Sequence, residues 1–182
     1  MLAREKEEHG GIKWGSAFFG WLTAAGTAIL VTALLSAIGT AVGLGALSGP
    51  QQAEREASQN AETVGIAGAV ALLVILFVAY YAGGYVAGRM ARFDGAKQGL
   101  AVWLWALVIA IVVAVVVAVA GTEYNVLSEL NSLPRVPIEE GDLATGGIIT
   151  AVAAIAASLG GAVLGGLAGM RFHRRVDRTG LG

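Results

Sequence analysis

Residues 100–120 read LAVWLWALVIAIVVAVVVAVA, a run that contains no charged side chain. A helix rises 1.5 Å per residue, so about 20 residues cross the ~30 Å hydrocarbon layer of a bilayer. This run has that length, and a helix that is apolar on every side is buried in protein or lipid rather than exposed to water. The run therefore predicts a transmembrane helix.

Three further long apolar segments lie at residues 16–47, 64–86 and 146–170. Hydrophobic residues make up 56% of the chain and charged residues 14%, whereas soluble domains carry about 25% charge. The first segment is too long for the apolar region of a secretory signal, so we expect it to be retained. The sequence predicts an all-α polytopic membrane protein, a four-helix bundle in one domain over residues 1–182, with outer loops at 49–62 and 121–145.

Lys and Arg are distributed unevenly among the segments between these helices. Ten of the 12 lie in the two tails and in the loop expected at 87–99, while the two outer loops hold only Arg55 and Arg135. Lys and Arg are enriched in cytoplasmic loops. The pattern therefore predicts a multi-pass protein with both termini in the cytoplasm.

Two pairs of short motifs indicate an internal repeat. Gly-x-Lys-x-Gly opens the first helix at 11–15 and the third at 95–99, and Gly-Gly-x-x-x-Gly occurs near the ends of the second and fourth, at 83–88 and 160–165. Self-similarity of this kind predicts two tandem helical hairpins, related by an axis along the membrane normal. The alternative is that Gly and basic residues simply recur at cytoplasmic helix ends.

Small residues recur at every fourth position of the helices. Lipid is as apolar as Leu, so membrane helices associate where small side chains let their backbones approach. The series include Ala106, Ala110, Ala114 and Ala118 in the third helix and a glycine zipper in the fourth. They serve either the internal bundle or contacts between subunits. The residues that we expect to pack helices are Gly20, Ser36, Gly83, Gly84, Gly88, Gly161, Gly165 and Gly169.

Hydroxyl side chains run through the middle of the first helix, at Thr23, Thr27, Thr32, Ser36 and Thr40. In lipid, such a hydroxyl commonly bonds to the carbonyl one turn back. The alternative is a polar strip that lines a path or binds a lipid.

Chemically reactive residues are scarce. The four spans contain no Asp, Glu, Lys, Arg or His, which argues against an ion-coupled transporter. His9 and His173 are isolated and Cys is absent, so neither a metal site nor thiol chemistry is expected. Phosphate-binding and nucleophile-elbow motifs are missing, and a net charge of −1 argues against a nucleic-acid partner. We predict no enzymatic activity and no cofactor.

Basic residues that follow the apolar segments are candidates for contact with anionic lipid headgroups. Each attracts such a surface by about 1 kcal/mol, although their role in fixing topology explains the same pattern. The candidates are Arg89, Arg92, Lys97, Arg171, Arg174, Arg175 and Arg178.

The stretch Gly83-Gly84-Tyr85-Val86-Ala87-Gly88-Arg89, followed by Gly95 and Gly99, resembles uncharacterised small four-helix bacterial membrane proteins of the YrzE-like kind. The opening at residues 10–18, GGIKWGSAF, is similar to actinobacterial members of that group. The resemblance implies a bacterial plasma-membrane protein and carries over no catalytic residues.

The leading functional prediction is a non-enzymatic membrane protein of structural or accessory type that acts through helix contacts. Its expected partners are membrane lipids, a second copy of itself as a homo-oligomer, or another membrane protein. The alternative is a neutral channel or a small-solute or lipid transporter built on the hydroxyl strip. A third and weaker alternative is a lipid-modifying enzyme that uses the cytoplasmic arginines, but it lacks a nucleophile–base pair.

Overall fold

The structure, a computed structural model, describes residues 10–46, 61–124 and 140–179. These residues form four helices: α2 (Trp14–Ala46), α4 (Ala61–Ala91), α5 (Gly95–Tyr124) and α7 (Glu140–Thr179). Each contains a segment of at least 25 residues that is long and apolar enough to cross a membrane. The described part of the chain holds no strand. The predicted all-α, multi-pass four-helix membrane fold is therefore confirmed.

All four helices begin before the apolar segments expected from the sequence, and α4, α5 and α7 also end beyond them. The predicted loop at 87–99 is wrong, because α4 continues to Ala91, α5 begins at Gly95 and only residues 92–94 connect them. Hydropathy specifies the part of a helix that lies in lipid, whereas helix-forming residues such as Ala, Met, Lys and Gln continue the helix into the interface. α4 begins at Ala61, inside the first expected outer loop, and the second outer loop is shorter than expected because α5 continues to Tyr124 and α7 begins at Glu140. The remainder of both loops lies outside the described residues.

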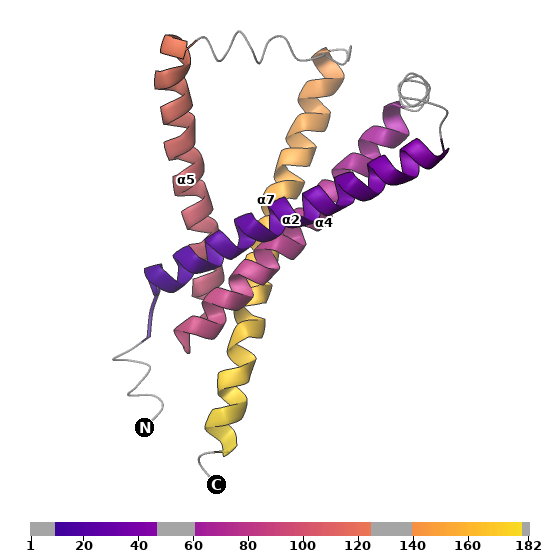
Figure 1. Ribbon diagram of the computed structural model, residues 1–182. Helices are drawn as coiled ribbons and strands as arrows, with labels where there is room; N and C mark the ends of the chain where they lie inside the picture. Colours follow the sequence, from indigo (N-terminus) through magenta and orange to yellow (C-terminus); the bar gives the residue numbers. More distant parts are fainter. Residues whose placement is uncertain (1–9, 47–60, 125–139, 180–182) are drawn as a thin grey trace.

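The helices pack closely only in the half of the bundle that carries the basic residues. Figure 1 shows α2 running beside α4, while α5 and α7 separate as they run toward Tyr124 and Glu140. Small buried residues mark the packed half, among them Ala17, Ala24, Ala79, Ala87, Ala101 and Ala162. In the other half, residues 110–119 of α5 are exposed without exception. We call these two parts the basic half and the outer half.

The bundle opens because the glycine contacts that bring the helices together lie in the basic half, and the helices diverge beyond it. Two straight helices that cross at an angle move apart with distance from the crossing. Residues 111–119 of α5, IVVAVVVAV, lie beyond this region of contact, and all of them are exposed. The small-residue series therefore lie in helix contacts over only part of their length.

Candidate functional site: helix contacts of the basic half

The contact between α4 and α7 consists of glycines that press against backbone. A Cβ added at Gly161 would lie 2.5 Å from the carbonyl oxygen of Phe77, and a Cβ at Gly165 or Gly169 would meet the next two turns of α4 just as closely. The spacing is four residues on both helices, so α4 and α7 run parallel with matched turns. No side chain larger than hydrogen fits at these positions without moving one helix. The backbones that they meet belong to Phe77, Tyr81 and Tyr85.

The same contact is reciprocal. Gly84 and Gly88 of α4 lie against the backbone of α7 at Ala162 and Gly166. Gly95 and Gly99 of α5 approach the same two carbonyl oxygens, those of Gly166 and Ala162, in antiparallel order. The backbone of α7 therefore contacts both α4 and α5 at Ala162 and Gly166.

A second crossing joins α2 to α4 at Gly20 and Gly83. A Cβ on Gly20 would lie 2.6 Å from the carbonyl oxygen of Gly83, 2.7 Å from a methyl of Val102 and 2.8 Å from the Cβ of Ala87. α2 therefore touches α4 and α5 at one level.

The structure thus places seven of the eight residues expected to pack helices at close backbone contacts. Ser36 differs, because it is exposed in the outer half of α2. Its role as a packing residue stays a prediction for contacts beyond the single chain. Three contact glycines, Gly95, Gly99 and Gly166, were not among the expected packing residues, although the four-residue spacing from Gly95 to Gly99 offered a signal.

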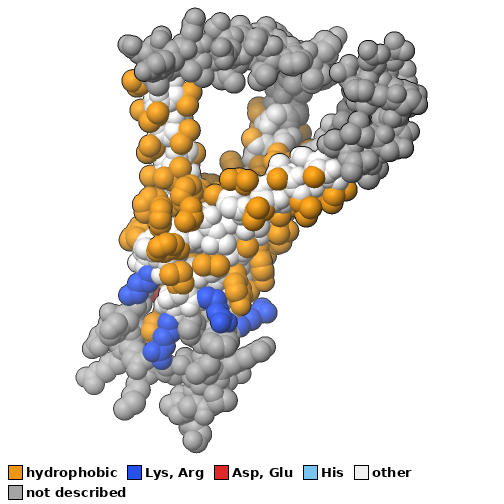
Figure 2. Space-filling view, viewed as in Figure 1, with side chains coloured by type: hydrophobic (Ala, Val, Ile, Leu, Met, Phe, Trp, Pro, Cys, Tyr) orange, Lys and Arg blue, Asp and Glu red, His pale blue; other side chains and the backbone are white. Residues whose placement is uncertain are grey.

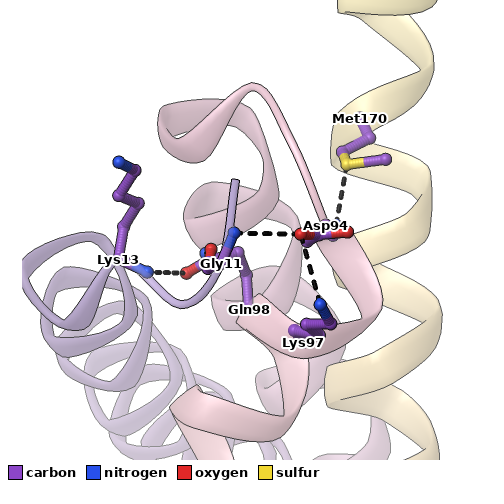
Figure 3. Close-up of polar contacts among 7 residues, drawn as sticks. Gly11, Lys13, Asp94, Lys97, Gln98 and Met170 are labelled. Atoms are coloured by element: carbon purple, nitrogen blue, oxygen red, sulfur yellow. Dashed lines mark hydrogen bonds and ion pairs between the residues drawn. The ribbon is translucent and has the colours of Figure 1, made fainter. Parts of the chain in front are cut away.

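Polar contacts tie the segment before α2 to the start of α5 (Figure 3). Gln98 is fully buried. Its Nε2 donates to the carbonyl oxygen of Gly11 at 3.0 Å, and its Oε1 accepts from the backbone N–H of Lys13 at 3.3 Å. Oδ2 of Asp94 accepts from the N–H of Gly11 at 3.0 Å. We call Asp94 and Gln98 the clamp, because together they hold both backbone groups of Gly11.

The turn between α4 and α5 is strained. Arg92 and Asp94 have φ values of 58° and 55°. These lie in the left-handed region, where the steric conflict of a Cβ with the backbone costs about 1–2 kcal/mol per residue. Gly11, at φ 97°, adopts a conformation that a side chain would oppose. Surrounding contacts hold the turn, including the hydrogen bond of 2.7 Å from the N–H of Gly95 to Sδ of Met170 in α7. The segment before α2, the start of α5 and Met170 of α7 therefore meet at the turn.

Cations and aromatic rings gather in the basic half. Figure 2 shows Lys and Arg side chains at one end of the molecule, next to a broad hydrophobic surface. Near them, the indole N–H of Trp105 donates to the carbonyl oxygen of Trp14 at 3.1 Å, and the indole N–H of Trp103 donates to Oγ of Ser158 at 3.2 Å. Among the lipid-contact candidates, Lys97 forms an ion pair with Asp94 at 3.4 Å, and the guanidinium of Arg92 lies 5.3 Å from the Phe93 ring.

The remaining lipid-contact candidates lie at the same end. Arg89 is half-buried in the last turn of α4, and Arg171 is exposed on α7. The helical backbone of α7 continues through positions 174, 175 and 178, whose side chains are outside the described set. Four acidic positions lie near the opposite helix ends: Glu62, Glu123, Glu140 and Asp142.

The hydroxyl side chains of α2 differ in burial and in hydrogen bonding along the helix. Thr23 donates to the carbonyl oxygen of Phe19, one turn back, at 2.9 Å. Thr27 is half-buried and Thr32 is exposed. Such a back-bonded hydroxyl needs no partner on another helix.

The described residues contain no group of three or more His, Asp or Glu side chains that could hold a metal ion. Comparison of the chain with protein-family models, with curated proteins and with solved structures finds no match.

Proposed function

We propose that this chain is a non-enzymatic membrane protein of structural or accessory type, which acts through helix contacts and assembles with a second copy of itself. One observation carries the proposal. A series of small residues in α5 begins at a helix contact and continues onto an exposed part of the same helix. Ala106 of α5 is half-buried, while Ala110, Ala114 and Ala118 continue the series and are exposed.

Only some helix contacts stabilise association in lipid. Side chains of Val and Ile are solvated by lipid as well as by protein, so association in a membrane depends on close backbone approach. A series of Ala at every fourth position offers that approach at any point along its length. In the basic half such series are used inside the chain, which supports the same use between chains in the outer half.

The proposed location is a bacterial plasma membrane with both termini in the cytoplasm. The uneven distribution of Lys and Arg supports this orientation, since the basic half would face the cytoplasmic leaflet. Exposed Lys13, Lys97 and Arg171 would then lie near anionic headgroups. The resemblance to YrzE-like proteins supports the bacterial assignment.

Disulfide crosslinking in native membranes tests the proposal. The chain has no Cys, so each single-cysteine variant reports one position without further changes. Ala114→Cys should form a crosslinked dimer upon mild oxidation. Val116→Cys is the matched control, because residue 116 is also exposed but lies about 200° around the helix. Equal crosslinking at both positions, or none at Ala114→Cys, would contradict the proposed contact.

One observation favours the alternative of a neutral channel or a small-solute or lipid transporter. Thr32 is exposed on the outer half of α2, where assembly of several copies could turn a hydroxyl toward a shared path. Solute flux into liposomes that contain the purified protein tests this alternative. A flux that Thr32→Val abolishes would support transport over the accessory role.

A further inference from the structure

The direction of α2 is determined in a short region near its start. From Ile29 to Gly39 every residue of α2 is exposed except Val31, which is half-buried. Nearer its beginning the helix is held at two places. One is the crossing with Gly83 at Gly20. The other is the region of its first residues, where the clamp binds Gly11 and Lys13 and the indole N–H of Trp105 donates to the carbonyl oxygen of Trp14. Two points of attachment are the minimum that fix the direction of a rod.

The clamp is made of side-chain contacts, in contrast to the crossing at Gly20. At the crossing, the backbones of α2 and α4 approach so closely that a Cβ on either Gly20 or Gly83 would clash with the other helix. The clamp consists of three hydrogen bonds from two side chains, and it holds a segment with a glycine at φ 97° beside a turn with two further positive φ values. Backbone in such conformations persists only where surrounding contacts hold it, so the segment would relax when those contacts open.

We infer that Asp94 and Gln98 act as a conformational clamp that sets the direction of α2, with the Gly20–Gly83 crossing as the pivot. When the clamp opens, the start of α2 moves away from the α4–α5 turn and its outer arm swings relative to α4. This inference does not depend on the proposed self-association.

The lever geometry gives the expected amplitude. Lys13 lies about 10 Å along the helix from Gly20, and Leu34 lies about 21 Å from Gly20 on the other side, at 1.5 Å per residue. A displacement of about 2 Å at the clamp, enough to break its hydrogen bonds, therefore moves Leu34 by about 4 Å in the opposite direction. A shift of this size is measurable between two spin labels.

Pulsed electron–electron distance measurements in lipid nanodiscs test the clamp. Leu34→Cys and Val70→Cys place exposed labels on the outer arms of α2 and α4. Val70→Cys and Val152→Cys form the reference pair, between α4 and α7. The reference pair shares one label and the same depth but does not include α2.

Gln98→Met is the main variant, because Met has a similar length, fills the buried volume and removes both hydrogen bonds of the amide. The 34–70 distance should shift by about 4 Å or its distribution should broaden by that amount, while the 70–152 distance stays as in the parent protein. Asp94→Ser is the second variant, since Ser still caps α5 but is too short to replace the carboxylate contact with Gly11. Asp94→Ser should shift the 34–70 distance in the same direction as Gln98→Met. It provides the test if Gln98→Met does not fold.

Ser158→Ala is the matched control. It removes a partly buried hydrogen bond, between α5 and α7, that does not involve α2. The 34–70 distance should not change in this variant. An unchanged 34–70 distribution in folded Gln98→Met or Asp94→Ser would overturn the inference. Equal changes in both label pairs would also overturn it, because they would indicate general loosening of the bundle.

Discussion

Gly165→Ala tests the close approach of α4 and α7 with one added methyl group. That Cβ would lie well within 3.0 Å of the carbonyl oxygen of Tyr81, which belongs to the backbone and cannot turn aside. The two helices must therefore separate, and the neighbouring contacts at Gly161 and Gly169 must loosen with them. Adding a methylene-sized group to a tightly packed region typically lowers the free energy of unfolding by about 1–3 kcal/mol.

Gly160→Ala is the control that isolates this effect. Gly160 lies in the same helix, one residue before the contact series, and a Cβ added there has no atom within 4 Å. Both substitutions gain the same helix propensity of roughly 1 kcal/mol, so that contribution cancels in the comparison. The Gly165→Ala protein should therefore be about 1–3 kcal/mol less stable than the Gly160→Ala protein.

Thermal unfolding in mild detergent measures the difference. For a chain of this size 1 kcal/mol corresponds to roughly 2–4 °C in Tm, so we expect Gly165→Ala to unfold roughly 2–12 °C below Gly160→Ala. Gly165→Leu should fall further, because its larger side chain forces the backbones farther apart. Equal Tm values for the two alanine variants would refute the reasoning, since they would mean that α4 and α7 are not in backbone contact at this level.

Two further predictions concern the pivot and the cations. Gly20→Ala should lower Tm relative to Gly26→Ala. A Cβ at residue 20 meets another helix, whereas a Cβ at residue 26 meets no atom within 4 Å. Equal Tm values would show that α2 does not cross α4 at Gly20. Lys13→Gln combined with Arg171→Gln should reduce the retention of anionic lipid, measured by native mass spectrometry, by about fivefold for each charge removed, since each is worth about 1 kcal/mol near an anionic surface. Unchanged retention would place the headgroups elsewhere.

Hydropathy alone was sufficient to predict the four helices, because a helix in lipid must be apolar on every side over about 20 residues. Helix ends were predicted less well. The turn between α4 and α5 is three residues long, and Asp94 directly before Gly95 is a typical N-cap signal that places the start of α5 at residue 95. The capping residue, and not hydropathy, marks this helix boundary in the sequence.

Packing positions were easier to predict than packing partners. The four-residue spacing of Gly161, Gly165 and Gly169 marks a face where a backbone can approach, but one sequence does not say which backbone it is. Gln98 shows a different difficulty, because a polar residue beside the end of an apolar run is normally expected to face water. Its burial depends on the segment at Gly11, which is more than 80 residues away in the sequence.

The mass of the intact protein in lipid nanodiscs, measured by native mass spectrometry with bound lipid retained, tests the proposed self-association most directly. The account predicts a defined oligomer, which Ala114→Leu converts to monomer because a larger side chain blocks the approach of a second α5. Val116→Leu, on the opposite side of α5, should keep the parent mass. A parent protein that has the mass of one chain at every concentration tested would contradict the proposal that the exposed small-residue series of α5 binds a second copy.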